Sequence, residues 1–248
     1  MSKSDKMHTD GSGGGRSPSI SVFFPCYNEV NNVAAVAERA IEVLEGLGVD
    51  FEVIIVDDGS SDGTKELADQ IAAQNTSVKV VHHPTNLGYG AALQSGFGAA
   101  RKDLVFYTDG DGQFDMKEMP ALLPLMAKYD IISCYRINRQ DNIIRKLNAW
   151  CWTRLVNILF RMQIRDIDCA FKLYKRKIFD EIQMSSTGAL IDTEILARAK
   201  QKGYTISQRP VHHYPRTAGK QTGANIKVIL RAFKELFGLY KKIRRSGN

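Results

Sequence analysis

Residues 104–115 read Leu-Val-Phe-Tyr-Thr-Asp-Gly-Asp-Gly-Gln-Phe-Asp. An apolar run with β-branched and aromatic residues, which is typical of a strand, ends here in two carboxylates, Asp109 and Asp111. Two carboxylates at the end of a buried strand are unfavourable unless a positive charge lies beside them. Oxygen ligands suit Mg²⁺ or Mn²⁺, and such an ion can neutralise a substrate's diphosphate. The stretch therefore predicts a divalent metal site at a strand end.

The acidic stretch has two other interpretations. A calcium-binding EF-hand loop needs Gly at its sixth position and Glu at its twelfth, where this chain has Phe114 and Pro120, so that interpretation fails. A solvated turn, in which Gly110 and Gly112 adopt positive φ, would explain the stretch if it stood alone. The rest of the chain favours the metal site.

Composition restricts the class of protein. With 44% hydrophobic and 25% charged residues, the 248-residue chain is expected to be globular. The net charge of +7 favours an anionic partner, such as nucleotide phosphates or an acidic membrane surface. Nucleic acid is not expected, because basic residues interleaved with aromatics on an exposed sheet are not found.

Location was also predicted from the sequence. The polar start of the chain does not resemble a signal peptide, and no apolar run is long enough to cross a bilayer. Four cysteines without a Cys-x-x-Cys pair indicate reduced thiols in a cytoplasmic protein.

The chain alternates between strand-like and helix-like segments. Strands are expected at 20–24, 51–56, 78–82, 104–108 and 131–134, and near 205–208. Helices are expected at 33–44, 64–73, 91–100 and 116–127. This alternation predicts parallel βαβ units. Residues 1–17 are interpreted as a flexible tail, 18–225 as the main domain and 226–248 as a basic amphipathic helix.

Polar clusters follow four of the predicted strands, at residues 25–29, 57–60, 82–84 and 109–111. Ligands of open α/β sheets bind at the carboxyl ends of the strands, so these clusters are expected to form one crevice. The run from Gly88 to Leu93 begins like a dinucleotide fingerprint, but it ends in Leu and follows the third strand, so a Rossmann dehydrogenase is disfavoured.

Four motifs follow one another along the chain: Phe24-Pro25-Cys26-Tyr27-Asn28-Glu29, Val56-Asp57-Asp58-Gly59-Ser60-Ser61-Asp62-Gly63-Thr64, Asn86-Leu87-Gly88-Tyr89-Gly90 and Asp109-Gly110-Asp111. In this order they resemble the motifs of the family 2 inverting glycosyltransferases, and most closely those of the polyprenyl (dolichyl) phosphate sugar synthases such as the dolichyl-phosphate mannose synthases. The resemblance covers roughly residues 20–220. It implies a single α/β domain of the nucleotide-diphospho-sugar transferase (GT-A) type, with a mostly parallel central sheet flanked by helices.

Two later segments, 166–172 and 213–220, also fit the family. The dolichyl-phosphate mannose synthases usually have Gly and Arg where this chain has Ala170 and Lys172. The reaction class is therefore implied, whereas the sugar, GDP or UDP as the nucleotide, and the acceptor stay open. The oligomeric state also stays open.

The resemblance implies roles for individual residues. The donor-binding residues would be Pro25, Tyr27, Glu29, Asp57, with Asp58 as a possible addition, Asp109 and Asp111. The metal ligands would be Asp109, Asp111 and Gln113, and the metal Mg²⁺ or Mn²⁺. An alternative role for the 57–62 segment is capping of the following helix, and both roles are expected to hold.

The choice of acceptor determines which catalytic groups are needed. A hydroxyl acceptor needs a general base, whereas a lipid phosphate is already ionised and needs cations to hold it. The candidate phosphate-binding residues are Arg136, Arg139, Arg216 and Lys220. Asp168 is the first candidate for a base or a sugar-binding carboxylate, followed by Asp192 and Glu194, whose charges could instead favour a first helical turn. The predicted catalytic set is Asp111, Asp168 and Arg216.

Two amphipathic segments carry many basic residues. In 226–245, Ile226, Ile229, Phe233, Phe237 and Tyr240 share one face beside several Lys and Arg side chains. Segment 143–162 is similar, with Trp150 and Trp152. Segment 143–162 could bind an anionic membrane or pack on the core, whereas membrane or subunit contact is preferred over core packing for 226–245.

The expected function is metal-dependent, inverting transfer of a sugar from GDP-mannose or a UDP-sugar to a polyprenyl phosphate, by a peripheral protein on the cytoplasmic face of a membrane. The alternatives are transfer to a hydroxyl of a saccharide or small molecule, and nucleotide-sugar binding without turnover.

Overall fold

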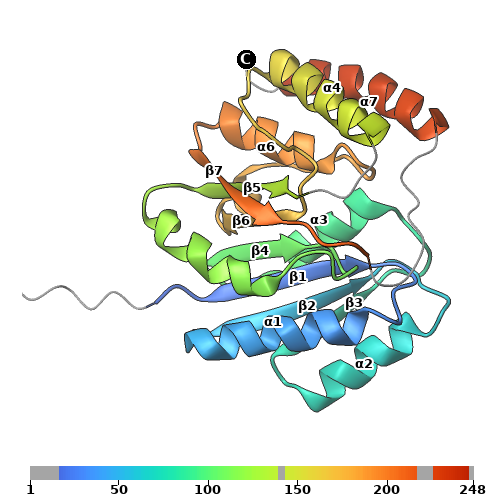
Figure 1. Ribbon diagram of the computed structural model, residues 1–248, viewed down its shortest axis with the longest axis vertical. Coiled ribbons are helices and arrows are strands. Elements are labelled where there is room, and N and C mark those ends of the chain that lie inside the picture. The colour runs from blue at the N-terminus through green and yellow to red at the C-terminus, as the bar shows by residue number, and fades with distance from the viewer. Residues whose placement is uncertain (1–16, 139–142, 217–225, 246–248) are drawn as a thin grey trace, which may run out of the picture.

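A seven-stranded sheet runs through the molecule in the order β3-β2-β1-β4-β6-β5-β7 (Figure 1). The computed structural model describes residues 17–138, 143–216 and 226–245, and it describes no side chains for 143–145 and 226–234. The expected 1–17 tail therefore lies almost entirely outside the described residues.

The first half of the chain follows the predicted alternation. Its strands are β1 (Ile20–Cys26), β2 (Phe51–Asp57), β3 (Val78–His82) and β4 (Leu104–Thr108). Its helices are α1 (Val33–Leu47), α2 (Thr64–Gln74) and α3 (Tyr89–Ala99). All neighbouring pairs among these strands are parallel, so their carboxyl ends share one edge of the sheet.

The second half of the chain adds an antiparallel strand. Its strands are β5 (Ile131–Ile137), β6 (Phe171–Lys175) and β7 (Ile206–His212), and its helices are α4 (Ile143–Phe160), α5 (Ile178–Glu181), α6 (Ile191–Gln201) and α7 (Ile226–Arg245). β6 was not among the expected strands, and it runs antiparallel to both β4 and β5. Because its direction is reversed, β6 begins where β4 and β5 end, and the preceding loop reaches the same sheet edge.

Segment 116–127 was predicted as a regular helix, and the predicted type of helix was wrong. The structure forms 3₁₀ turns, η1 (Met116–Ala127), with Pro120 and Pro124 inside them. Proline has no amide hydrogen and clashes with an α-helical backbone, so two prolines four residues apart favour the tighter and shorter turns. Asp115 begins the segment by accepting a hydrogen bond from the Lys117 amide at 3.0 Å.

Helices cover both faces of the sheet. α1, α2 and η1 lie on one face, and α3 and α6 lie on the other. Aromatic rings fill the α3 side, where Phe97 contacts Phe23, Tyr107 and Tyr174 at centroid distances of 4.7, 5.7 and 5.5 Å. Stacked and edge-on rings bury a large apolar area and fix the position of α3 on the sheet.

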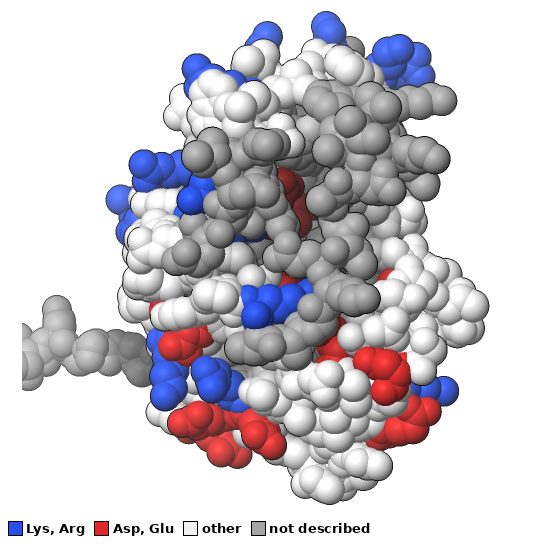
Figure 2. Space-filling view, turned by 45° about the vertical axis from the view of Figure 1, so that its right-hand side comes forward, with Lys and Arg blue, Asp and Glu red and all other residues white. Residues whose placement is uncertain are grey.

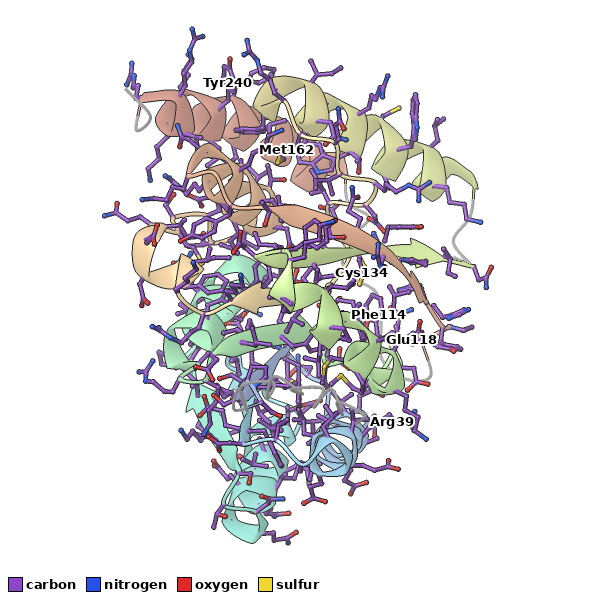
Figure 3. All side chains as sticks on the ribbon, turned by 90° about the vertical axis from the view of Figure 1, so that its left-hand side faces the viewer. Arg39, Phe114, Glu118, Cys134, Met162 and Tyr240 are labelled. Atoms are coloured by element: carbon purple, nitrogen blue, oxygen red, sulfur yellow. The ribbon has the colours of Figure 1, made fainter. Side chains whose placement is uncertain are left out.

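α4 and α7 lie side by side beyond α6, outside the main layers (Figures 1 and 3). The ring of Phe160, at the end of α4, lies 5.8 Å from that of Tyr240 on α7. α7 packs through Leu236, Leu239 and Ile243, which are buried. The expected apolar face was therefore misplaced, because Phe237 points outward with 51% of its surface exposed.

None of the helices in the described ranges is both long enough and apolar enough to cross a membrane.

Candidate functional site

The carboxyl ends of β1 and β4 lie very close together at Gly110. A Cβ atom on this residue would lie 2.6 Å from the Pro25 carbonyl oxygen and 2.7 Å from the Cys26 sulfur. Only glycine fits so near another backbone, which explains the residue between the two carboxylates. Asp109 and Asp111 are thereby held against the 25–29 cluster, as expected for strand ends at one edge.

Asp109 and Asp111 form a concentrated negative charge. Burial, followed by the charge of Asp111, raises the pKa of Asp109, although a hydrogen bond from the Tyr89 hydroxyl at 3.1 Å opposes the rise. Burial also raises the pKa of Asp111, against the opposing effects of the Gln113 amide and Arg216. Both carboxyls are thus costly to ionise without a further cation, which is the electrostatic setting of a metal-binding pair.

The loop after β4 is tied to the segment that follows β7. Gln113 donates from Nε2 to the Tyr214 carbonyl at 2.9 Å, and the Tyr214 amide donates to the Gln113 carbonyl at 2.9 Å. The ring of Phe114, labelled in Figure 3, contacts His213 edge-on at 5.2 Å. These contacts bring Arg216 to the carboxylate loop.

Arg216 lies between acidic side chains from two strand ends. Its Nη2 donates to Glu29, and its Nη1 lies 3.7 Å from Asp111 Oδ2. The arginine side chain is only 16% exposed, and those of Glu29 and Asp111 are 11% and 14% exposed, so the ion pairs are poorly screened. Sequence reasoning placed Arg216 in a phosphate-binding loop, and its pairing with Glu29 could not be inferred from spacing.

The second strand end holds two buried carboxylates with different partners. Asp57 accepts from the Ser60 amide at 3.0 Å and lies 3.0 Å from Nδ1 of His82. Asp58 accepts from the amides of Leu87 and Gly88 at 2.9 and 3.0 Å, and so it holds the loop before α3. Asp58 is therefore a structural anchor, whereas the donor-binding role of Asp57 stays a prediction.

Other predicted donor-binding residues lie at the mouth of the same edge. Pro25 is half-buried and Tyr27 is 45% exposed, directly after β1. Asp62, rather than Ser61, accepts from the Thr64 amide at 3.0 Å at the start of α2, so the expected capping by this segment is present.

Asp168 lies in the loop before β6, close to the end of β4. Thr108 pairs with Phe171 across these antiparallel strands, so the residues before β6 lie alongside those after β4. Asp168 is an exposed residue, but the surrounding protein removes part of the hydration of its carboxyl group. Loss of hydration, and then the charges of Asp192 and Asp166, raise its pKa to about 6, although Arg136 and Lys172 oppose the rise. Such a carboxyl is ionised at neutral pH and is more basic than an ordinary aspartate.

Several predicted charged residues are engaged inside the protein. Arg136 donates from Nε and Nη2 to the two oxygens of Asp166, both at 2.7 Å. Asp192 is paired with Lys172 at 2.7 Å, and Glu194 accepts from the Ser185 and Ser186 amides at 2.9 and 2.7 Å. Both acids lie in the first turn of α6, but each is bound to these partners rather than left to interact with the helix end alone. Arg139 and Lys220 lie outside the described residues.

The donor set fits a hard divalent cation. In the described ranges, no group of three or more His, Cys, Asp or Glu residues could hold a metal ion by itself. Asp109 and Asp111 would therefore supply part of the coordination, and diphosphate oxygens and water the rest, which is the way proteins usually hold Mg²⁺ with nucleotides. Gln113 donates to Tyr214 through its side-chain nitrogen, so its side-chain oxygen would be the atom to bind such an ion, and this role stays a prediction.

Comparison with known proteins identifies the family. Residues 21–183 match the profile of Glycosyl transferase family 2, and the chain belongs to that family. AglD, a glycosyltransferase of Haloferax volcanii, is 32% identical over 207 residues, which is 79% of this chain and 33% of AglD. Dodecaprenyl-phosphate galacturonate synthase of Rhizobium johnstonii is 29% identical over 169 residues, 66% of this chain and 50% of that protein. The chain thus spans a third to a half of the length of these relatives.

Solved structures confirm the expected GT-A fold. Mannosyl-3-phosphoglycerate synthase from Rubrobacter xylanophilus superposes with a TM-score of 0.68 at 17% identity, covering 93% of this chain and 75% of that one. Glucosyl-3-phosphoglycerate synthase from Mycobacterium tuberculosis, solved with Mn²⁺, UDP and glucosyl-3-phosphoglycerate, gives 0.63 at 18% identity, covering 91% and 77%. The chain therefore has the GT-A fold, with a single mostly parallel sheet.

Proposed function

We propose that the protein transfers a sugar from a nucleoside-diphosphate sugar to a polyprenyl phosphate, with Mg²⁺ or Mn²⁺ bound by Asp109 and Asp111. The observation that carries the proposal is the position of Arg216 against Asp111 and Glu29. A cation that pairs with carboxylates in the absence of substrate is well placed to bind phosphate oxygens when substrate enters.

The donor would bind across the ends of β1, β2 and β4. Asp57 would accept hydrogen bonds from the base or ribose, with Pro25 and Tyr27 beside the nucleoside. The bound metal would neutralise the diphosphate and so make it a better leaving group. Gly110 supports this arrangement, because it brings the metal carboxylates next to Pro25.

The transfer itself needs one bond to form as another breaks. An oxygen of the acceptor phosphate attacks the anomeric carbon from the side opposite the diphosphate, and the carbon–oxygen bond to the diphosphate breaks with its electron pair leaving on the nucleotide. An ionised phosphate has no proton to give up, so Arg216 would position it, and Asp168 would contact the sugar. The name of the Rhizobium johnstonii relative supports a polyprenyl phosphate acceptor.

The outer surface of α4 and α7 would hold the protein at an anionic membrane. Leu147, Trp150 and Ile158 recur at helical spacing on α4 and are 56%, 63% and 68% exposed. Arg154 lies on the same face, and Phe237 is exposed on α7. Figure 2 shows Lys and Arg gathered at the top of the molecule, over the helices farthest from α1 and α2. Exposed aromatics with basic residues are typical of interfacial helices.

The cysteines support a cytoplasmic location for this membrane face. Cys26, Cys134 and Cys169 are buried and unpaired, and Cys151 is exposed and also unpaired. Free thiols of this kind suit a reducing compartment.

A second candidate is transfer to a hydroxyl of a small molecule. The pKa of Asp168, raised to about 6, favours it, because a hydroxyl acceptor needs a carboxylate base at the site. The Mycobacterium tuberculosis neighbour, solved with a sugar-bearing phosphoglycerate, gives the same fold with a small product.

A single incubation separates the candidates. The full chain is mixed with Mn²⁺, labelled UDP- or GDP-sugars, and either polyprenyl phosphate in vesicles or soluble acceptors that include phosphoglyceric acid. Label extracted with the lipid supports the proposal, whereas label found only in a soluble product favours the hydroxyl acceptor. Nucleotide binding without transfer to either would overturn both.

A further inference from the structure

A buried ion pair lies beneath the candidate site. Lys172 of β6 has no exposed side-chain surface, and its Nζ lies 2.7 Å from Oδ1 of Asp192, which is 4% exposed. Removing two charges from water is costly, and replacing such a pair by apolar side chains often does not destabilise a protein. The pair is therefore poorly explained by stability alone.

The remaining partners of Lys172 point to a specific task. Its Nζ donates to the carbonyl of Ile167 at 3.0 Å and to the carbonyl of Cys169 at 2.6 Å. These carbonyls lie on either side of Asp168. Ile167 and Cys169 have no exposed surface, whereas Asp168 between them is an exposed residue, so the ammonium holds the loop from its buried side.

The same network reaches the metal carboxylates. Nζ of Lys172 lies 3.0 Å from the Tyr107 hydroxyl, which donates to Asp192. Tyr89 donates to Asp109 at 3.1 Å, and after burial the charges of Asp109 and Asp192 raise the pKa of this tyrosine, so Asp192 acts on the residue that holds Asp109. Tyr107 and Lys172 are directly paired across β4 and β6, so the network is built into the sheet register.

We propose that Lys172 is a positioning residue, which fixes Asp168 at the donor site through the carbonyls of Ile167 and Cys169, with Asp192 as its counterion. The inference rests on the proposed role of Asp168 at the site. It differs from a merely structural pair, because the hydrogen bonds to the two carbonyls, rather than the neutralised charge, are what the reaction requires.

The pKa of Asp168 depends on the charges around it, so the pH dependence of turnover reports on the position of the 166–170 loop. Among the described residues, Asp192 on α6 and Asp166 in the loop raise its pKa, and Arg136 on β5 and Lys172 on β6 lower it. Asp192→Asn removes a negative charge but leaves the Lys172 hydrogen bonds to the loop. Lys172→Met removes the positive charge and both of those hydrogen bonds.

The experiment compares Lys172→Met, Asp192→Asn and the double variant Lys172→Met/Asp192→Asn with the wild-type chain. Nucleotide binding with Mn²⁺ is measured by calorimetry, turnover is measured against pH, and hydrogen exchange is measured for the amides of 166–170. Lys172→Met alone leaves Asp192 buried and unpaired and can fail to fold, so the double variant, which has no such charge, carries the test.

We expect the double variant to bind nucleotide as the wild type does, while kcat falls by about tenfold or more and the 166–170 amides exchange faster. Asp192→Asn removes a negative charge that raises the pKa of Asp168, so the acidic limb of its pH profile should shift to lower pH. Wild-type kcat in the double variant would overturn the inference. If the wild type transfers no sugar, the proposed function fails, and the exchange rates still decide whether Lys172 holds the loop.

Discussion

Arg216 donates a hydrogen bond to Glu29, a residue 187 positions earlier in the chain. The same guanidinium lies 3.7 Å from Asp111. One side chain after β7 therefore contacts the residues that follow β1 and β4. A diphosphate or phosphate entering this edge would compete with both carboxylates for Arg216, and a metal ion on Asp111 would weaken the pull of that carboxylate on the arginine.

Substitution of Arg216 should reduce catalysis. A hydrogen bond to a charged group contributes roughly 1.5–3 kcal/mol, so Arg216→Ala should lose about tenfold or more in kcat/KM. Arg216→Lys should lose less, because it keeps the charge but not the planar pair of donors. Steady-state kinetics with a polyprenyl phosphate acceptor test this, with Arg209→Ala, on exposed β7, as the matched control. Near-normal kinetics for Arg216→Ala would contradict the phosphate-binding role.

Metal binding should depend on Asp109 and Asp111. Asp111→Asn should abolish Mn²⁺-dependent nucleotide binding while the thermal unfolding temperature changes little, because the side chain lies in a loop outside the core. Asp115→Asn changes a carboxylate of the same loop that accepts from the Lys117 amide, and it should keep metal binding. Calorimetric titration provides the measurement. Undiminished turnover in excess chelator would mean that the pair does not serve a metal.

Membrane attachment should depend on the exposed face of α4. A basic residue at an anionic surface contributes on the order of 1 kcal/mol, and Arg154→Glu replaces this attraction with a repulsion, so binding to anionic vesicles should weaken by about tenfold or more. Arg39 is exposed on α1, at the opposite end of the molecule in Figure 3, and Arg39→Glu should have no such effect. Co-sedimentation at low salt measures both, and equal losses would assign the effect to net charge alone.

Removal of α7 is not a clean test of attachment. Its buried Leu236, Leu239 and Ile243 pack on the protein, so truncation would expose apolar surface as well as remove basic residues. Point substitutions on the outer face avoid this ambiguity.

Acid stability should depend on Asp130 at the start of β5. Partial burial opposes ionisation, but the Thr205 amide, Lys175 and the Thr205 hydroxyl outweigh it and lower the pKa of Asp130 to about 2. A lowered pKa means that the carboxylate stabilises the fold above its unfolded-state pKa and that this stabilisation is lost as pH falls from about 4 to about 2.

Asp130→Asn should therefore lower the free energy of unfolding at pH 7 by about 2 kcal/mol and flatten its decline below pH 4. Urea unfolding between pH 2 and 7 measures both effects. A variant whose stability falls in parallel with the wild type across this range would show that another carboxyl governs the acid limb.

The sequence predicted the parallel half of the fold because each strand is followed by polar residues and then by a helical pattern. It did not predict β6. Residues 171–175 include two lysines, which suggests an exposed strand, yet Lys172 is fully buried. Asp192 on α6 and the carbonyls of Ile167 and Cys169 satisfy the buried ammonium. Local patterns carry no record of such a distant partner.

The location of the site was predicted from the sequence, but the pairing of its side chains was not. Strand ends located Asp57, Asp109 and Asp111 at one edge, because that follows from parallel pairing alone. Which side chains are already engaged could not be read from spacing: Asp166, thirty residues away, accepts from Nε and Nη2 of Arg136. The donor, acceptor and metal roles of these residues stay predictions.

The antiparallel direction of β6 affects how much the connection between β5 and β6 can vary. The chain leaves β5 and enters β6 at the same edge of the sheet, so residues 138–170 start and finish as neighbours. A connection of another length or sequence could therefore join β5 and β6 without changing the order of the strands in the sheet. The outer α4 surface and Asp168 are thus carried by one connection between two neighbouring strands, so both could change together while the order of the sheet stays the same.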